Sequence, residues 1–153
     1  MKPMTIIVQS CARVLVPFAV IFGMYIIAHG HLTPGGGFQG GAAIASVIAL
    51  VIISYGHDFT AKAIAKEQLV KLESAGLLAF ISLVFLGLGA TAFYNFLAHG
   101  GVIFGQAVPY GVNGGFFNTA GILPLCNAVV GLEVVAGIGI ILLMMAYGAG
   151  AKE

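Results

Sequence analysis

The chain has 153 residues, of which 60% are hydrophobic and 7% are charged, and its formal net charge is +1. Soluble domains carry about 25% charged residues, so this composition excludes a water-soluble globule, and the small net charge gives no indication of a nucleic-acid partner. A membrane-spanning helix needs about 20 apolar residues, so the length allows roughly four spans within one membrane domain, residues 1–153. We therefore predict an all-α integral membrane bundle of about four transmembrane helices.

The first apolar segment covers residues 5–28 and contains Arg13 and Pro17. Because proline lacks an amide proton and crowds the carbonyl group four residues earlier, we expect a bend near these two residues. The other apolar segments are residues 40–55, 74–97 and 122–147. The charged stretch between the second and third segments, residues 57–73, is predicted to be a solvated connection with some helical character.

The cations fall on one side of the predicted bundle. With four spans, the two termini and the 57–73 connection share a side, and that side holds Lys2, Lys62, Lys66, Lys71 and Lys152. The two loops on the opposite side hold no lysine or arginine. The positive-inside tendency then predicts a multi-pass protein of the cell membrane with both termini in the cytoplasm.

Small residues recur every four positions within the predicted spans, at Ala19 and Gly23 in the first and at Gly41, Ala45 and Ala49 in the second. Such residues let helix backbones approach closely inside a membrane, where no hydrophobic force drives helices together. These faces either close the four helices on one another or dock other subunits, and the sequence leaves both interpretations open.

Glu133 lies near the middle of the fourth predicted span. An acidic residue at the centre of a membrane helix costs about 2.5–3.5 kcal/mol on insertion scales, and such residues usually pair with a partner or face water. Glu133 is therefore either a proton-exchanging or ion-contacting carboxylate, or a structural acid bonded to a neighbouring helix or subunit. Arg13 is the candidate partner within the chain, although it lies nearer to the membrane surface.

The loop after the first span contains His29 and His31, which could pass protons at the membrane edge because histidine titrates near neutral pH. Two histidines without a third ligand do not predict a metal site. We find no nucleophile–base set, paired carboxylates or cofactor motif, so the chain is not expected to be an enzyme by itself or to bind a cofactor.

The same loop continues as Pro34-Gly35-Gly36-Gly37-Phe38 and ends with Gly40-Gly41. A proline followed by glycines favours a non-helical loop between the first two spans. Such backbone persists in a membrane only where protein or water covers it, so Phe38 is expected to pack the loop down. The lysine and serine or threonine of a phosphate-binding loop are missing.

The string from His29 to Gly41 resembles the signature of the B-type subunit of Mrp multisubunit sodium/proton antiporters. Related subunits occur in the membrane arms of membrane-bound hydrogenases and sulfur reductases. The resemblance covers essentially the whole chain, including a fourth span that opens with Gly121-Ile122-Leu123-Pro124-Leu125. It implies an accessory subunit of a module that moves Na⁺ and H⁺, with lipid and other membrane subunits as partners.

In that family the main pumping residues belong to larger subunits, so the resemblance implies a role in assembly and a possible share of the ion path. The family motif maps onto residues 34–38, whereas the role of Glu133 rests on its predicted burial alone. The module could be a standalone antiporter or the arm of a redox-driven complex such as a hydrogenase. Two alternatives remain: a purely structural scaffold subunit with no ion-path role, and an independent small homo-oligomeric transporter.

Overall fold

A computed structural model describes residues 3–86, 91–98 and 120–150. The helices within these ranges are α1 (Ile6–Ala28), α2 (Gly36–Tyr55), α3 (His57–Ala63), α4 (Lys66–Leu86) and α5 (Leu123–Gly150). The described residues contain no strand, and four of these helices are long and apolar enough to cross a membrane. The all-α bundle predicted from the composition is confirmed.

Two of the helices begin earlier than the sequence analysis expected. Helix α2 begins at residue 36 instead of 40, and α4 begins at residue 66 instead of 74. The charged side chains of Lys66, Glu67 and Lys71 do not interrupt α4 because all three are exposed. At its other end, the expected continuation of this span to residue 97 is wrong, since residues 91–98 form turns. Gly87 and Gly89 in the preceding sequence disfavour a continuing helix.

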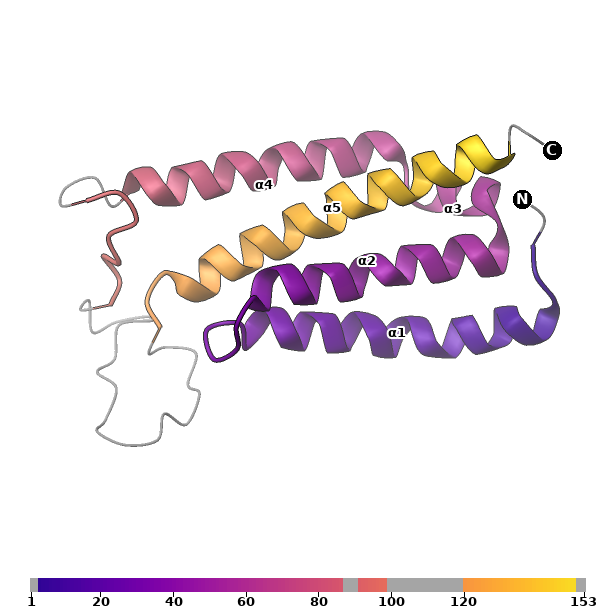
Figure 1. The fold of residues 1–153 in the computed structure, drawn as a ribbon, viewed down its shortest axis with the longest axis horizontal. Coiled ribbons are helices and arrows are strands. Elements are labelled where there is room, and N and C mark those ends of the chain that lie inside the picture. Colours follow the sequence, from indigo (N-terminus) through magenta and orange to yellow (C-terminus); the bar gives the residue numbers. More distant parts are fainter. Residues whose placement is uncertain (1–2, 87–90, 99–119, 151–153) are drawn as a thin grey trace.

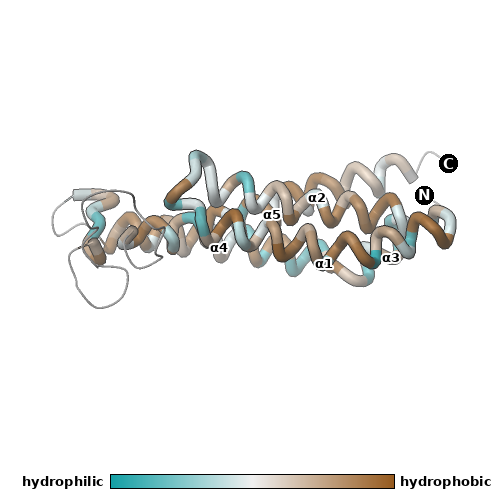
Figure 2. The backbone as a smooth tube through the Cα atoms, turned by 90° about the horizontal axis from the view of Figure 1, so that it is seen from below, coloured by the Kyte–Doolittle hydropathy of each residue, from teal (hydrophilic) through white to brown (hydrophobic). Residues whose placement is uncertain are grey.

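Helices α2 and α5 form the centre of the bundle, and α1 and α4 are the outer helices (Figure 1). Helices α2 and α5 run parallel to each other, whereas α1 and α4 run in the opposite direction. Within the chain, 44% of an 18-residue apolar stretch of α2 is buried, compared with 11% of the corresponding stretch of α1 and of α4. Hydrophobic residues cover most of the length of the four long helices (Figure 2), so the outer helices present broad apolar faces to lipid or to other subunits.

Glycines of α2 allow close contact with both of its neighbours. A β-carbon on Gly40 would lie 2.6 Å from the carbonyl oxygen of Gly23 in α1. A β-carbon on Gly41 would lie 2.7 Å from the carbonyl oxygen of Gly131 in α5. Adjacent glycines thus face different helices, because successive residues of a helix point about 100° apart. At these positions the small residues close the chain on itself.

Helix α1 begins and α5 ends at the same end of the bundle, which we refer to as the terminal end (Figure 1). Here the Tyr55 hydroxyl at the end of α2 donates a hydrogen bond of 3.0 Å to the Gln9 carbonyl oxygen. The backbone N–H of Met4 donates to the carbonyl oxygen of Ser54 at 3.1 Å. These bonds fix the start of α1 against the end of α2. The opposite end, which holds the turn between α1 and α2, is the loop end.

Candidate functional site

Glu133 lies on α5 and faces α4 across a close contact. A β-carbon placed on Gly76 of α4 would lie 3.3 Å from Cβ of Glu133, and the Glu133 side chain is half-buried. The missing side chain of Gly76 is what lets the two helices approach at this level. Glu133 lies ten residues into α5, or about 15 Å from the loop end of the helix, which is the middle of an apolar layer about 30 Å thick.

A second carboxylate, Glu73, reaches the same seam between α4 and α5. Its Oε1 atom lies 3.4 Å from the position that a β-carbon on Gly137 would occupy. Gly137 follows Glu133 by one helical turn, and Glu73 precedes Gly76 by about one turn. The two carboxylate side chains therefore enter one seam from opposite helices, separated by about one turn along its length.

Packing of the central helices shows how deep Glu73 lies. A β-carbon on Gly139 would contact both Ile48 Cδ1 at 2.8 Å and Leu69 Cδ1 at 3.3 Å, so these three residues share one level. Ile48 precedes Tyr55, the last residue of α2, by seven residues, or about 10 Å. Glu73 follows Leu69 by four residues, which places it about one turn, or 6 Å, nearer to the middle of the bundle. Its depth is therefore close to half the length of α2.

Glu73 was not predicted as a site residue, because residues 57–73 were expected to form a solvated connection. The structure instead places Glu73 inside α4, two turns after its start at Lys66. The local signal was the run Lys66-Glu67-Gln68-Leu69, whose residues all favour a helix. Because this run is charged, the span was predicted to begin at residue 74, eight residues after the observed start of α4.

Arg13 is not the partner of Glu133. It lies exposed on α1, and the ion pair found in the described part of the chain joins His57 and Asp58 instead. Gly23 packs at the level of Gly40, and Arg13 lies ten residues from Gly23 toward the terminal end. Gly131 packs against Gly41, one residue after Gly40, and Glu133 lies only two residues from Gly131 toward the terminal end. The two charged residues therefore differ by about 10 Å along the bundle axis.

The two histidines lie in the turn after α1 and do not join the carboxylates. The His29 ring lies against Tyr25 in a tilted arrangement with centroids 4.1 Å apart, and its Nδ1 donates to the Tyr25 carbonyl oxygen at 3.0 Å. The ring nitrogens of His31 are buried. Between them, Gly30 contacts the side chain of Asn127, which is six residues, or about 9 Å, from Glu133 along α5. Over the described ranges, no three His, Cys, Asp or Glu side chains are arranged to hold a metal ion.

The glycine-rich loop is shorter than the sequence suggested. Turns occupy residues 29–35, and Gly35 adopts a left-handed conformation, with φ of 79°, immediately before α2. From residue 36 onward the motif is helical and packs against α5: a β-carbon on Gly37 would lie 2.7 Å from the carbonyl oxygen of Asn127. The motif therefore starts a helix at a close three-helix contact.

Phe38 does not pack the loop down. It lies in the first turn of α2 with 59% of its surface exposed, so the expectation that it anchors the loop is wrong. The side chain of Asn127 covers the turn instead, because it occupies the space next to the α-carbon of Gly30. Neither Asn127 nor its contact was recognised from the sequence, since an asparagine in an apolar span has no distinctive spacing.

Residues 7–140 match the model of a family described as a domain related to the MnhB subunit of Na⁺/H⁺ antiporters. The chain belongs to this MnhB-related family. The resemblance predicted from the motif at residues 29–41 is confirmed. Together with four apolar helices of sufficient length, membership identifies a multi-pass membrane protein.

Individual relatives agree with this assignment. An uncharacterized protein of Methanocaldococcus jannaschii is 35% identical over 136 residues, which cover 88% of this chain and 49% of that protein. The B-type Na⁺/H⁺ antiporter subunit of Bacillus subtilis is 30% identical over 99 residues, which cover 64% of this chain and 66% of that protein. This MnhB-related chain thus spans about half the length of its archaeal relative and about two thirds of its bacterial one.

A solved structure shows the same fold in a larger assembly. A chain of the membrane-bound sulfane sulfur reductase, an archaeal respiratory membrane complex, superposes with a TM-score of 0.70 and 29% sequence identity. The match covers 92% of this chain and 57% of that chain. The fold of the MnhB-related chain therefore occurs as part of a multisubunit membrane complex.

The features of the MnhB-related chain divide between two faces of α5. The glycine motif at the start of α2 packs on the side of α5 that carries Asn127 and Gly131. The carboxylates occupy the side that faces α4. The glycine motif therefore makes helix-packing contacts, and the two carboxylates, Glu73 and Glu133, lie in a separate seam.

Proposed function

We propose that this MnhB-related chain is an accessory subunit of a membrane complex that exchanges sodium ions for protons. The complex is either a standalone antiporter or the membrane arm of a redox-driven complex. The names of the bacterial relative and of the structurally similar complex support this proposal. The fold supports it as well, because the outer helices α1 and α4 leave most of their surfaces uncovered by the chain itself.

Within that complex we assign Glu133 to the ion path, with Glu73 beside it. The observation that carries this assignment is that two carboxylates from different helices enter one seam, about one helical turn apart. In the described part of the chain, neither forms an ion pair with a basic side chain. Ionisable residues at this depth in membrane helices are costly, and they mark ion pathways and proton relays when they persist.

The assignment is tested with Glu133→Gln and Glu73→Gln in the assembled complex. The complex is isolated through an affinity tag on this chain and reconstituted into liposomes, and sodium-driven proton movement is followed with a pH-sensitive dye. Glutamine keeps the size and hydrogen-bonding capacity of glutamate but removes its charge and its exchangeable proton. We expect both variants to assemble normally and to exchange ions at least tenfold more slowly, which corresponds to about 1.4 kcal/mol.

Glu67→Gln is the matched control, because Glu67 lies on α4, as Glu73 does, but is exposed and outside the seam. It should assemble and exchange at the rate of the unchanged complex. Full exchange by an assembled Glu133→Gln complex would leave the chain with a purely structural role. Exchange catalysed by this chain alone in liposomes would instead show an independent transporter and would overturn the subunit assignment.

We also propose that the chain lies in the cell membrane with its terminal end in the cytoplasm. The exposed lysines Lys62 and Lys66 lie at or near this end, in α3 and at the start of α4, and support this orientation. A single cysteine at Lys62, in a chain whose native Cys11 and Cys126 are replaced by serine, should react with an impermeant maleimide in inverted membrane vesicles. The same cysteine should stay unmodified in intact cells. Labelling from outside intact cells would reverse the orientation.

A further inference from the structure

A pocket of about 240 Å³ opens at the terminal end of the bundle. It lies between α3, the start of α4 and the last turns of α5, and its lining residues are His57, Ala61, Lys66, Leu143, Met144 and Tyr147. The lining combines a cation, an imidazole ring and a phenol with apolar side chains. It includes no carboxylate, although the chain carries acidic residues nearby at Asp58 and Glu67.

The pocket lies at the level where an apolar layer would end. Its wall residue Leu143 belongs to the buried cluster that also contains Ile52 and Leu69, so one side of the pocket is continuous with the core. His57 is the first residue of α3 and lies two residues after Tyr55, where α2 ends, and Lys66 is the first residue of α4. The polar part of the lining is thus at the boundary between membrane and water, where lysine and tyrosine side chains typically lie.

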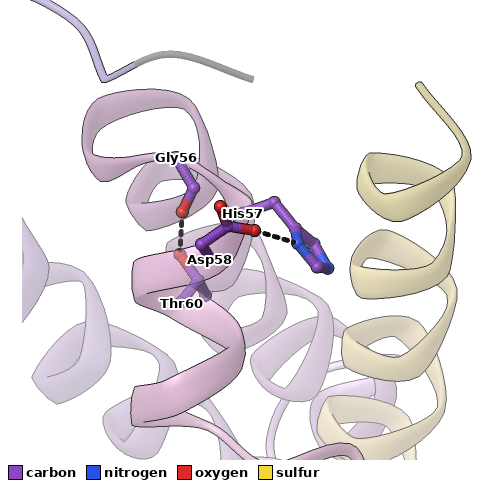
Figure 3. Close-up of polar contacts among 4 residues, drawn as sticks. All are labelled: Gly56, His57, Asp58 and Thr60. Atoms are coloured by element: carbon purple, nitrogen blue, oxygen red, sulfur yellow. Dashed lines mark hydrogen bonds and ion pairs between the residues drawn. The ribbon is translucent and has the colours of Figure 1, made fainter. Parts of the chain in front are cut away.

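Local contacts hold the His57 ring in place before any ligand arrives. Nδ1 of His57 lies 3.1 Å from Oδ1 of Asp58, whose side chain is 96% exposed. Figure 3 shows the ring of His57 extending toward α5, and its centroid is 5.7 Å from that of Tyr147. The first turn of α3 is fixed by Thr60, which is buried and donates from Oγ1 to the Gly56 carbonyl oxygen at 2.9 Å (Figure 3).

We propose that this pocket binds one anionic phospholipid, with its phosphate at Lys66 and Tyr147 and the upper part of an acyl chain on Leu143 and Met144. Charge complementarity selects the anionic class, because the lining contains a lysine and no acidic side chain. Basic pockets between membrane helices on the cytoplasmic side bind the head groups of anionic lipids. The apolar wall favours a lipid over free phosphate, since phosphate alone would leave the exposed side chain of Met144 uncovered.

The inference is tested by native mass spectrometry of the full chain purified in a mild detergent. The chain is delipidated and then titrated with dioleoylphosphatidylglycerol, with dioleoylphosphatidylcholine, or with inorganic phosphate as separate probes. We expect one phosphatidylglycerol to bind with clear preference over phosphatidylcholine, and phosphate to compete weakly. A lysine near an anionic head group is expected to contribute about fivefold in affinity, so Lys66→Gln should weaken phosphatidylglycerol binding by about that factor.

Lys62→Gln is the matched control, because Lys62 is an exposed lysine of α3 that does not line the pocket. It should retain the affinity of the unchanged chain. Tyr147→Phe removes only a hydroxyl group and should also weaken binding, which keeps the test informative if Lys66→Gln folds poorly. Equal binding of the two lipids, or equal losses in Lys66→Gln and Lys62→Gln, would overturn the proposal. Full competition by inorganic phosphate would show an anion site that does not require a lipid.

Discussion

Gly41 of α2 lies directly against the backbone of Gly131 in α5. A β-carbon on Gly41 would come within 2.7 Å of the Gly131 carbonyl oxygen and within 2.8 Å of Cβ of Val134. Both of these atoms are held by the α5 backbone, so neither can move aside as the end of a flexible side chain could. The contact between the two central helices therefore depends on the absence of a side chain at this position.

Gly41→Ala should destabilise the bundle. The added methyl group forces α2 and α5 apart, and overpacking of this kind typically costs about 1–3 kcal/mol. The free energy of unfolding in mixed micelles, followed by the loss of helical circular dichroism on titration with sodium dodecyl sulfate, measures the effect.

Gly148→Ala is the control for that measurement. Gly148 is also helical, but a β-carbon there would meet no atom within 4 Å. Alanine favours a helix more than glycine by about 1 kcal/mol, so this change should be neutral or mildly stabilising. Equal stability of the Gly41→Ala and Gly148→Ala chains would contradict the packing described for α2 and α5.

Gly56 joins α2 to α3 in a conformation that only glycine adopts readily, with φ of 88° and ψ of 163°. Gly56→Ala should cost about 1–3 kcal/mol because an alanine in this region is strained. The strain should appear in the same detergent titration. Ala61→Gly is the comparison, because it lies in α3 with ordinary helical geometry and should cost only about 1 kcal/mol. A smaller loss for Gly56→Ala than for Ala61→Gly would show that the junction relaxes.

The sequence predicted the number of long helices and the first and last of them closely, because hydrophobic composition and length dominate those choices. It misplaced the start of α4 because the charged residues Lys66 and Lys71, which are exposed on the helix, resemble a solvated loop in the sequence. It missed the seam at Glu73 for the same reason. That seam depends on which residues of two distant segments share a level, and periodicity within one segment carries no such information.

The glycine motif shows the opposite case. The sequence predicted the family from these residues, but the loop conformation expected for them holds only up to Gly35. Glycine is poor in an isolated helix, by about 1 kcal/mol relative to alanine. Close packing of Gly37 and Gly41 on α5 offsets this preference. Tertiary contact decides the conformation here, and it is visible only when α5 is in place.

Asn95 fixes the chain as it enters α5. Its Oδ1 accepts a hydrogen bond from the backbone N–H of Ile122 at 2.9 Å, and its Nδ2 donates to the carbonyl oxygen of Ala120 at 3.3 Å. Asn95→Ala leaves both partly buried backbone groups without their partner, which costs about 1–3 kcal/mol. We expect earlier cleavage by proteinase K near residues 91–98, monitored by mass spectrometry, while the helical content stays unchanged.

Ser82→Ala is the control for that experiment, because the Ser82 hydroxyl donates to the Leu78 carbonyl oxygen within its own helix, at 2.7 Å. Removing this bond should leave the cleavage pattern as it was. A similar protease sensitivity in both variants would mean that Asn95 does not hold this segment.

Arg13 and Glu133 should contribute to stability independently. Because they differ by about 10 Å in depth, the free-energy changes of Arg13→Gln and Glu133→Gln should add within about 0.5 kcal/mol in the double variant. Glu73 and Glu133 share a seam, so the corresponding cycle between Glu73→Gln and Glu133→Gln should show a coupling of about 0.5–3 kcal/mol. Both cycles are measured by the same detergent titration. Coupling in the first cycle and additivity in the second would place Arg13, not Glu73, beside Glu133 and would contradict the arrangement of α4 and α5.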